Sequence, residues 1–183
     1  MHQLTHAYQT TLQRETSLSN DPVQQIQLQY QLAQSYEDQN DIASAQRVIE
    51  SVYANNPKLV GVIRSTVDFY WNHKQPQRAV ATLIAAAHAA NASLAHDYTL
   101  EAVDKSNHSG DFSGARALLQ PLLAADPFNA RYLDLEGQSF SLAHDDAGLR
   151  DLYTNTLIAL QKAPLSTQNR RDKICLLYTS RCV

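Results

Sequence analysis

The chain has 183 residues, of which 44% are hydrophobic and 18% are charged, and its formal net charge at neutral pH is −3. This balance gives no basic surface for nucleic acid, and no stretch is long and apolar enough to predict a membrane-spanning helix. Glycine is scarce, at 5 residues, whereas alanine, leucine and glutamine are abundant, which favours helices. The first 20 residues are polar and lack the apolar core of a signal peptide, which weakly favours a cytoplasmic location.

A helical period of 3.6 residues recurs along the chain and predicts helices separated by short turns. The first, over about residues 3–17, places Leu4, Tyr8 and Leu12 on one buried stripe. Gly110-Asp111 is the clearest turn, because glycine accepts positive φ and aspartate caps the next helix. The later helices are predicted at about 23–38, 42–55, 59–73, from Pro76 onward, 94–108, 112–125, 130–143 and 146–161, with Ser166 as a candidate cap for one more.

The predicted helices repeat themselves along the sequence. Tyr36 and Ala45 return 34 positions later as Tyr70 and Ala79, and Ala115 continues the series after a shift of two residues. A period of this length is typical of stacked helix–turn–helix units, in which each pair of helices buries its apolar face against the next pair. Such stacks usually bind other molecules, so the repeat favours binding over catalysis.

The repeated residues resemble the tetratricopeptide repeat (TPR) family over residues 23–163. Departures from the motif occur at Thr66, Asn91, Ser106 and Leu149. The residues that carry the resemblance are, repeat by repeat, Leu32, Ala33, Tyr36, Ala45, Ile49, Val52 and Pro57; Val67, Tyr70, Ala79, Leu83 and Ala86; Ala102, Ala115, Leu119, Leu122 and Pro127; and Gly137, Phe140 and Tyr153.

The resemblance implies an all-α fold, a right-handed superhelical solenoid of antiparallel helix pairs. The small residues are expected where two helix axes approach closely, and the aromatic rings between one pair and the next. The implied organisation is a leading helix within 1–22 that resembles half of an incomplete repeat, four repeats at about 26–59, 60–93, 96–129 and 130–163, and the start of a further helix at 164–174.

The last nine residues, 175–183, leave the helical pattern and contain both cysteines. This segment resembles a translated transposon-end adapter from sequencing-library preparation, so we interpret it as a non-native tail. The alternative is a genuine short tail. On the first interpretation the natural part has no cysteine, carries 18 acidic against 14 basic residues, and continued beyond Ile174.

No pattern of catalytic or metal-binding residues is present in the sequence. There is no Gly-x-Ser-x-Gly turn, no glycine-rich phosphate loop and no His-Glu-x-x-His pair. His2 and His6 share a helix face at a spacing that can bind a metal, but no acidic residue lies near them, and two solvated side chains at a helix end are the simpler interpretation. We therefore predict no enzyme activity, no cofactor and no metal.

By the resemblance, the first helix of each pair lines a concave face. Six carboxylates and two arginines are expected there, which argues against an acidic ligand and favours a neutral or basic peptide with an apolar anchor. The acids can equally be a solvated helix face, and Trp71 can equally pack on the adjacent repeat. The predicted partner-binding residues are Tyr30, Gln34, Arg64, Asp68, Trp71, Asp104, His108 and Asp134.

Two functions remain open from the sequence. The first is a non-catalytic scaffold that binds a peptide or partner domain in the concave face. The alternative is a docking or regulatory arm of a larger enzyme whose catalytic part is missing from this fragment. The acidic balance argues against nucleic acid as the partner, and the sequence does not indicate an oligomeric state.

Overall fold

The computed structural model describes residues 2–163, with side chains from His6 onward. The predicted helix at Ser166 and the adapter-like segment 175–183 lie outside the described residues. The described part is helical, without strands, and divides into two compact units, one ending at Ala90 and the other beginning at Asn91. We call them the N-terminal and C-terminal units. The prediction of an all-α fold built from antiparallel helix pairs is confirmed within each unit.

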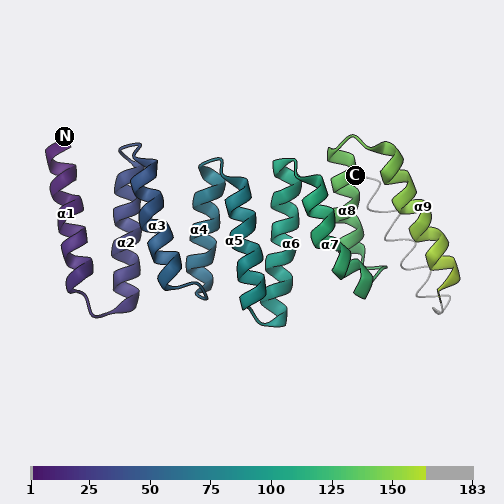
Figure 1. Cartoon of the computed structure of the whole chain (residues 1–183), viewed down its shortest axis with the longest axis horizontal. Helices are drawn as coiled ribbons and strands as arrows, with labels where there is room; N and C mark the ends of the chain where they lie inside the picture. Colours follow the sequence, from purple (N-terminus) through teal and green to yellow (C-terminus); the bar gives the residue numbers. More distant parts are fainter. Residues whose placement is uncertain (1, 164–183) are drawn as a thin grey trace. The chain divides into compact units, whose positions relative to one another are not determined.

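The N-terminal unit contains five helices that run alternately up and down (Figure 1). Each helix packs on the next one along the chain. The short turns between them hold neighbours antiparallel, so consecutive helices form hairpins. The helices are α1 (His2–Leu18), α2 (Pro22–Glu37), α3 (Ile42–Asn55), α4 (Val60–Asn72) and α5 (Pro76–Ala89).

The C-terminal unit contains four helices within the described residues, again as consecutive antiparallel neighbours (Figure 1). In addition to the consecutive contacts, α6 packs directly on α8. The first of these helices begins two residues earlier than predicted, because the Asn91 side chain accepts a hydrogen bond from Leu94 N–H and so caps the helix there. The helices are α6 (Ala92–Ser109), α7 (Phe112–Ala125), α8 (Ala130–Leu142) and α9 (Asp146–Lys162).

One turn geometry recurs between the two helices of a pair. At three such turns an aspartate accepts a hydrogen bond from the N–H three residues ahead, and the residue before it has positive φ. These turns are Asn40-Asp41, Gly110-Asp111 and His144-Asp145, with φ values of 60°, 85° and 55°. The predicted role of Asp111 as a helix cap is confirmed. At the remaining turn Lys74 has φ 58°, and Pro76 takes the first helical position without a side-chain cap.

The repeated small residues lie at the tightest points of the core. Ala45, Ala79 and Ala115 are all 0% exposed, as expected for side chains that let two helix axes approach closely. The inward prediction for Tyr8 is wrong, because its side chain is 50% exposed. Within the described residues α1 packs only on α2, so the side of α1 that faces away from α2 has no described neighbour to cover it.

Candidate functional site

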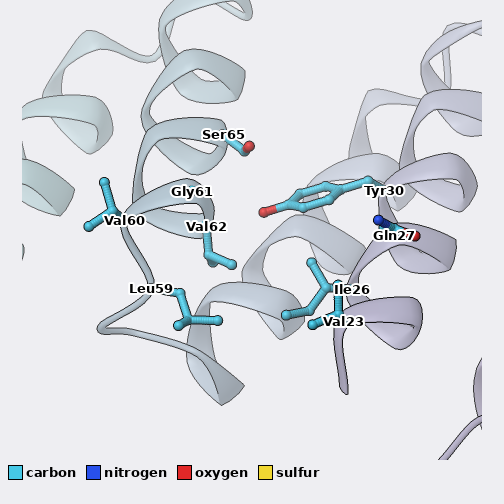
Figure 2. Close-up of a pocket in the computed structure, with 9 residues that line it drawn as sticks. All are labelled: Val23, Ile26, Gln27, Tyr30, Leu59, Val60, Gly61, Val62 and Ser65. Atoms are coloured by element: carbon cyan, nitrogen blue, oxygen red, sulfur yellow. The ribbon is translucent and has the colours of Figure 1, made fainter. Parts of the chain in front are cut away.

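An apolar hollow of about 400 Å³ opens between α2 and α4 in the N-terminal unit (Figure 2). Ile26 reaches into it from α2 and Val62 from α4, and the Tyr30 ring extends across from α2 toward Ser65. None of the nine described lining residues is charged. They are Val23, Ile26, Gln27, Tyr30, Leu59, Val60, Gly61, Val62 and Ser65.

The hollow exists because α2 and α4 are not direct neighbours. No Cα atom of one helix lies within 8 Å of a Cα atom of the other, and α3 packs on both. Side chains must therefore fill the space, and those that the sequence supplies are too short to do so. As a result Val23, Leu59 and Val60 remain 62%, 49% and 38% exposed. Apolar side chains gathered at such exposure around a concave surface indicate a place where another molecule binds.

The Tyr30 hydroxyl is one of three polar side-chain groups that the described residues place at the wall of the hollow, together with those of Gln27 and Ser65. Its oxygen is buried, faces the Ser65 hydroxyl and makes no hydrogen bond of ordinary geometry within the described residues. Burial raises the pKa of Tyr30, and the nearby Ser65 hydroxyl partly offsets the rise. Tyr30 is therefore a neutral phenol at physiological pH. A buried hydroxyl that lacks a partner is destabilising, so a ligand atom that bonded to it would bind favourably.

The first turn of α4 forms another part of the wall and is unusually open. Leu59 occupies the N-cap position and provides no side-chain hydrogen bond to the N–H groups of the first turn, whereas Asn129 caps α8 through Arg131 N–H at 3.1 Å. At Gly61 an added Cβ would meet no described atom within 4 Å. Backbone N–H groups at an uncapped helix start are hydrogen-bond donors without intrahelical partners.

Beyond the hollow, the α2–α4 surface becomes polar toward the helix C-termini. Arg64 and Asp68 are exposed on α4, and Trp71 is half-buried on the same helix. On α2, Gln34 donates a hydrogen bond to Asp38 at 3.0 Å. The predicted residues Tyr30, Gln34, Arg64, Asp68 and Trp71 are thus all on α2 and α4, and Tyr30 lines the hollow itself.

A contact between the Glu37 and His73 side chains joins the two helices at this polar end. His73 Nε2 lies 2.5 Å from Glu37 Oε1, and the His73 ring contacts that of Phe69 with centroids 4.4 Å apart. Both partners of the pair are about three-quarters covered, with side-chain exposures of 20% and 26%. The Glu37–His73 contact fixes α2 against α4 at one end. Within the described residues no such ion pair links the two helices at the opposite end, where the hollow lies.

The core side of α4 is held by a second polar cluster that spans α3, α4 and α5. The Tyr70 hydroxyl donates to Glu50 at 3.0 Å, and Arg78 pairs with Glu50 at 2.8 Å. Burial, together with the hydrogen bond to Glu50, raises the pKa of Tyr70 to about 12. Burial alone would raise the pKa of Glu50, but hydrogen bonds from Gln46 and Tyr70 and the charge of Arg78 outweigh it and lower that pKa. The cluster holds the C-terminal part of α4 against α3 and α5.

The other predicted residues belong to the C-terminal unit. Asp104 and His108 lie one turn apart on α6, with 3.7 Å between His108 Nδ1 and the Asp104 carboxylate, and both side chains are about half exposed. Asp134 on α8 accepts a hydrogen bond from Gln138 at 3.1 Å. Their role in partner binding stays a prediction. The eight predicted residues therefore form two groups, one in each unit.

The sequence pattern does not predict the hollow, although it predicts Tyr30 as a partner-binding residue. Ile26 and Val62 both follow the apolar helical period, which is typical of core side chains. Val62 is indeed 3% exposed, whereas Ile26 is half-buried at the edge of the hollow. Two signals could have found the site: a glycine in the first turn of a helix, and a leucine where a capping residue is usual.

The described part of the chain contains neither a metal-binding cluster nor a membrane-spanning helix. No three His, Cys, Asp or Glu side chains are placed there to hold a metal ion. Among the described helices none has the length and apolar character needed to cross a membrane.

No protein-family model and no curated protein matches the chain. Several solved structures are similar to it. "MamA MSR-1 C2" is 13% identical, with 85% of this chain and 88% of that chain covered and a TM-score of 0.47. "Crystal structure of MamA protein" is 12% identical, with 88% and 85% covered and a TM-score of 0.48, and "MamA AMB-1 P212121" is 14% identical, with 92% and 97% covered and a TM-score of 0.45. These values assign the chain to no family and to no function.

Proposed function

We propose that this chain is a non-catalytic, TPR-like scaffold that binds a peptide or a partner domain on the face formed by α2 and α4. The observation that carries the proposal is the hollow of about 400 Å³ with its exposed aliphatic rim. A concave, mainly apolar surface with a few polar groups is typical of a binding site. The 34-residue repeat supports the TPR-like interpretation.

The expected partner segment is neutral or basic and carries an apolar anchor. An apolar side chain in the hollow would cover Val23, Leu59 and Val60, which are otherwise partly in water. The exposed acids Asp38 and Asp68 lie farther along the same two helices and would favour basic residues beside the anchor. Exposed charges of this kind contribute more to association rate and specificity than to affinity.

Peptide selection against the immobilised full chain tests the proposal. Selected peptides should share an apolar anchor, carry neutral or positive charge, and bind at least tenfold more weakly to Gly61→Phe, which places a ring in the hollow. Gly61→Ala is the matched control, because its Cβ meets no described atom within 4 Å. Circular dichroism of both variants checks the fold.

Two results would contradict the proposal. One is a selection that enriches no binding sequence, or only acidic ones. The other is a set of peptides whose affinity is the same for the wild type and for Gly61→Phe, since such peptides would bind elsewhere on the chain.

A further inference from the structure

The two units of this chain contain matching helix pairs, so one unit can be used to interpret the other. Adding 70 to a residue number in α2–α5 gives its counterpart in α6–α9. Asp41 corresponds in this way to Asp111, and both cap the helix that follows. Ala45 corresponds to Ala115, and both are 0% exposed. The correspondence therefore holds for a helix cap and for a core position as well as for the helix order.

The counterparts of the hollow-lining residues are aromatic. Ile26 corresponds to His96 and Val62 to Tyr132, and in the C-terminal unit these two rings lie 5.6 Å apart between α6 and α8. Tyr132 also packs against the apolar core of that unit. The position between the first helices that is open in the N-terminal unit is therefore occupied by a pair of rings in the C-terminal unit.

From this correspondence we propose that the α2–α4 hollow binds an aromatic side chain of a partner protein. The inference rests on the proposed function, and it specifies the anchor. A ring presented by the partner would take the place that Tyr132 and His96 fill in the C-terminal unit. The walls suit such a group, because Ile26, Val62 and Leu59 are aliphatic and none of the nine described lining residues is charged.

The Tyr30 hydroxyl, which makes no hydrogen bond of ordinary geometry within the described residues, indicates which aromatic side chains the hollow prefers. Its C-terminal counterpart is Leu100, which packs on the apolar core and needs no hydrogen bond. Tyr30 instead places a buried oxygen without a partner beside the hollow. A tyrosine or tryptophan anchor carries a polar group on its ring that can pair with this oxygen, whereas phenylalanine cannot. The preferred anchor is therefore tyrosine or tryptophan.

Small ring compounds test the inference directly on the full chain. We expect p-cresol and indole, the side-chain analogues of tyrosine and tryptophan, to shift the amide resonances of Gly61 and Ser65 in titrations followed by NMR. Toluene, which lacks the polar group, should bind at least threefold more weakly. The alcohol 3-methylbutan-1-ol, which has a hydroxyl but no ring, should bind at least tenfold more weakly than p-cresol.

Variants that exchange the corresponding side chains between the two units test the inference further. Ile26→His combined with Val62→Tyr copies the C-terminal pair into the hollow and should weaken p-cresol binding at least tenfold. Gly61→Phe is the second variant and should act in the same way if the first does not fold. Conversely, His96→Ile with Tyr132→Val opens the equivalent place in the C-terminal unit, and p-cresol should then shift amides on α6 and α8.

The outcomes separate this inference from the proposed function. It is overturned if the rings shift no amide near Gly61, if 3-methylbutan-1-ol binds as well as p-cresol, or if Gly61→Phe leaves ring binding unchanged. If peptides selected on the α2–α4 face carry aliphatic anchors while the rings do not bind, the inference fails and the proposed function stands. If neither peptides nor rings bind, both fail.

Discussion

The α2–α4 pair and the α6–α8 pair occupy matching places in the two units but bring their helices together differently. Helices α6 and α8 touch, and Asn107 links them by donating to the Leu135 carbonyl at 3.1 Å while accepting from the Ser139 hydroxyl at 2.5 Å. No Cα atom of α2 lies within 8 Å of a Cα atom of α4, and the two helices leave a hollow between them. The C-terminal unit therefore uses the facing surfaces of its two helices to hold them together, whereas the N-terminal unit leaves a hollow between the corresponding surfaces.

The largest expected difference between the pairs concerns Leu135 and its counterpart Ser65. Leu135 is 0% exposed within the core of the C-terminal unit, so Leu135→Ala should cost about 2–5 kcal/mol of unfolding free energy through lost burial and a cavity. Ser65→Ala should change stability by less than about 0.5 kcal/mol, because Ser65 borders an existing hollow. Urea unfolding followed by far-UV circular dichroism measures both.

Fluorescence assigns each effect to a unit, because Trp71 on α4 is the single tryptophan of the chain. The loss of stability caused by Leu135→Ala should appear mainly in the transition followed by circular dichroism, rather than in the one followed by Trp71 fluorescence. Equal costs for the two variants would mean that the two pairs are packed alike, and the comparison would then be wrong.

The next effect tests the close helix approach that both units share. Ala79 is 0% exposed, and Ala79→Leu should cost about 1–3 kcal/mol or more, because the added atoms force neighbouring side chains off their preferred rotamers. Asp68→Ala, on the exposed face of α4, is the matched control and should cost less than about 0.5 kcal/mol. Thermal melting of the two variants measures both stability losses, and equal melting midpoints would contradict the alignment of the repeats.

A slightly smaller effect is expected at the polar links between first helices. Asn107 is 2% exposed, so Asn107→Ala leaves the Ser139 hydroxyl and the Leu135 carbonyl without this partner at a cost of about 1–3 kcal/mol. Glu37→Ala removes the pair with His73, whose side chains keep partial access to water, and should cost less than about 1 kcal/mol. A larger loss for Glu37→Ala than for Asn107→Ala in urea unfolding would reverse the proposed roles.

The sequence predicted the fold well and the site only in part. Helix positions and core alanines follow from a period and a repeat, which are local signals read along one chain. Ser106 stands where the repeat motif has an aromatic residue. In the structure Ser106 and the neighbouring Asn107 are both buried, and the sequence pattern does not predict the burial of these polar side chains. The hollow depends on the distance between two helices that are not neighbours in sequence, and residue types alone do not give that distance.

The smallest expected effect is a pH dependence confined to the polar cluster of Glu50, Tyr70 and Arg78. Because the pKa of Glu50 is lowered in the folded chain, its contribution to stability is present above the unfolded value of about 4.3 and is lost as the pH falls through the folded value. Glu50→Gln should therefore reduce the difference in urea midpoint between neutral pH and about pH 3, as reported by Trp71 fluorescence. Glu101→Gln, in the C-terminal unit, is the control and should leave that difference unchanged. The effect is modest, because the Glu50 side chain is 38% exposed and solvent screens its pair with Arg78. If Glu50→Gln and the wild type lose the same stability in acid, the cluster does not hold α4 through this charge, and the packing of α4 on α3 and α5 alone keeps the helix in place.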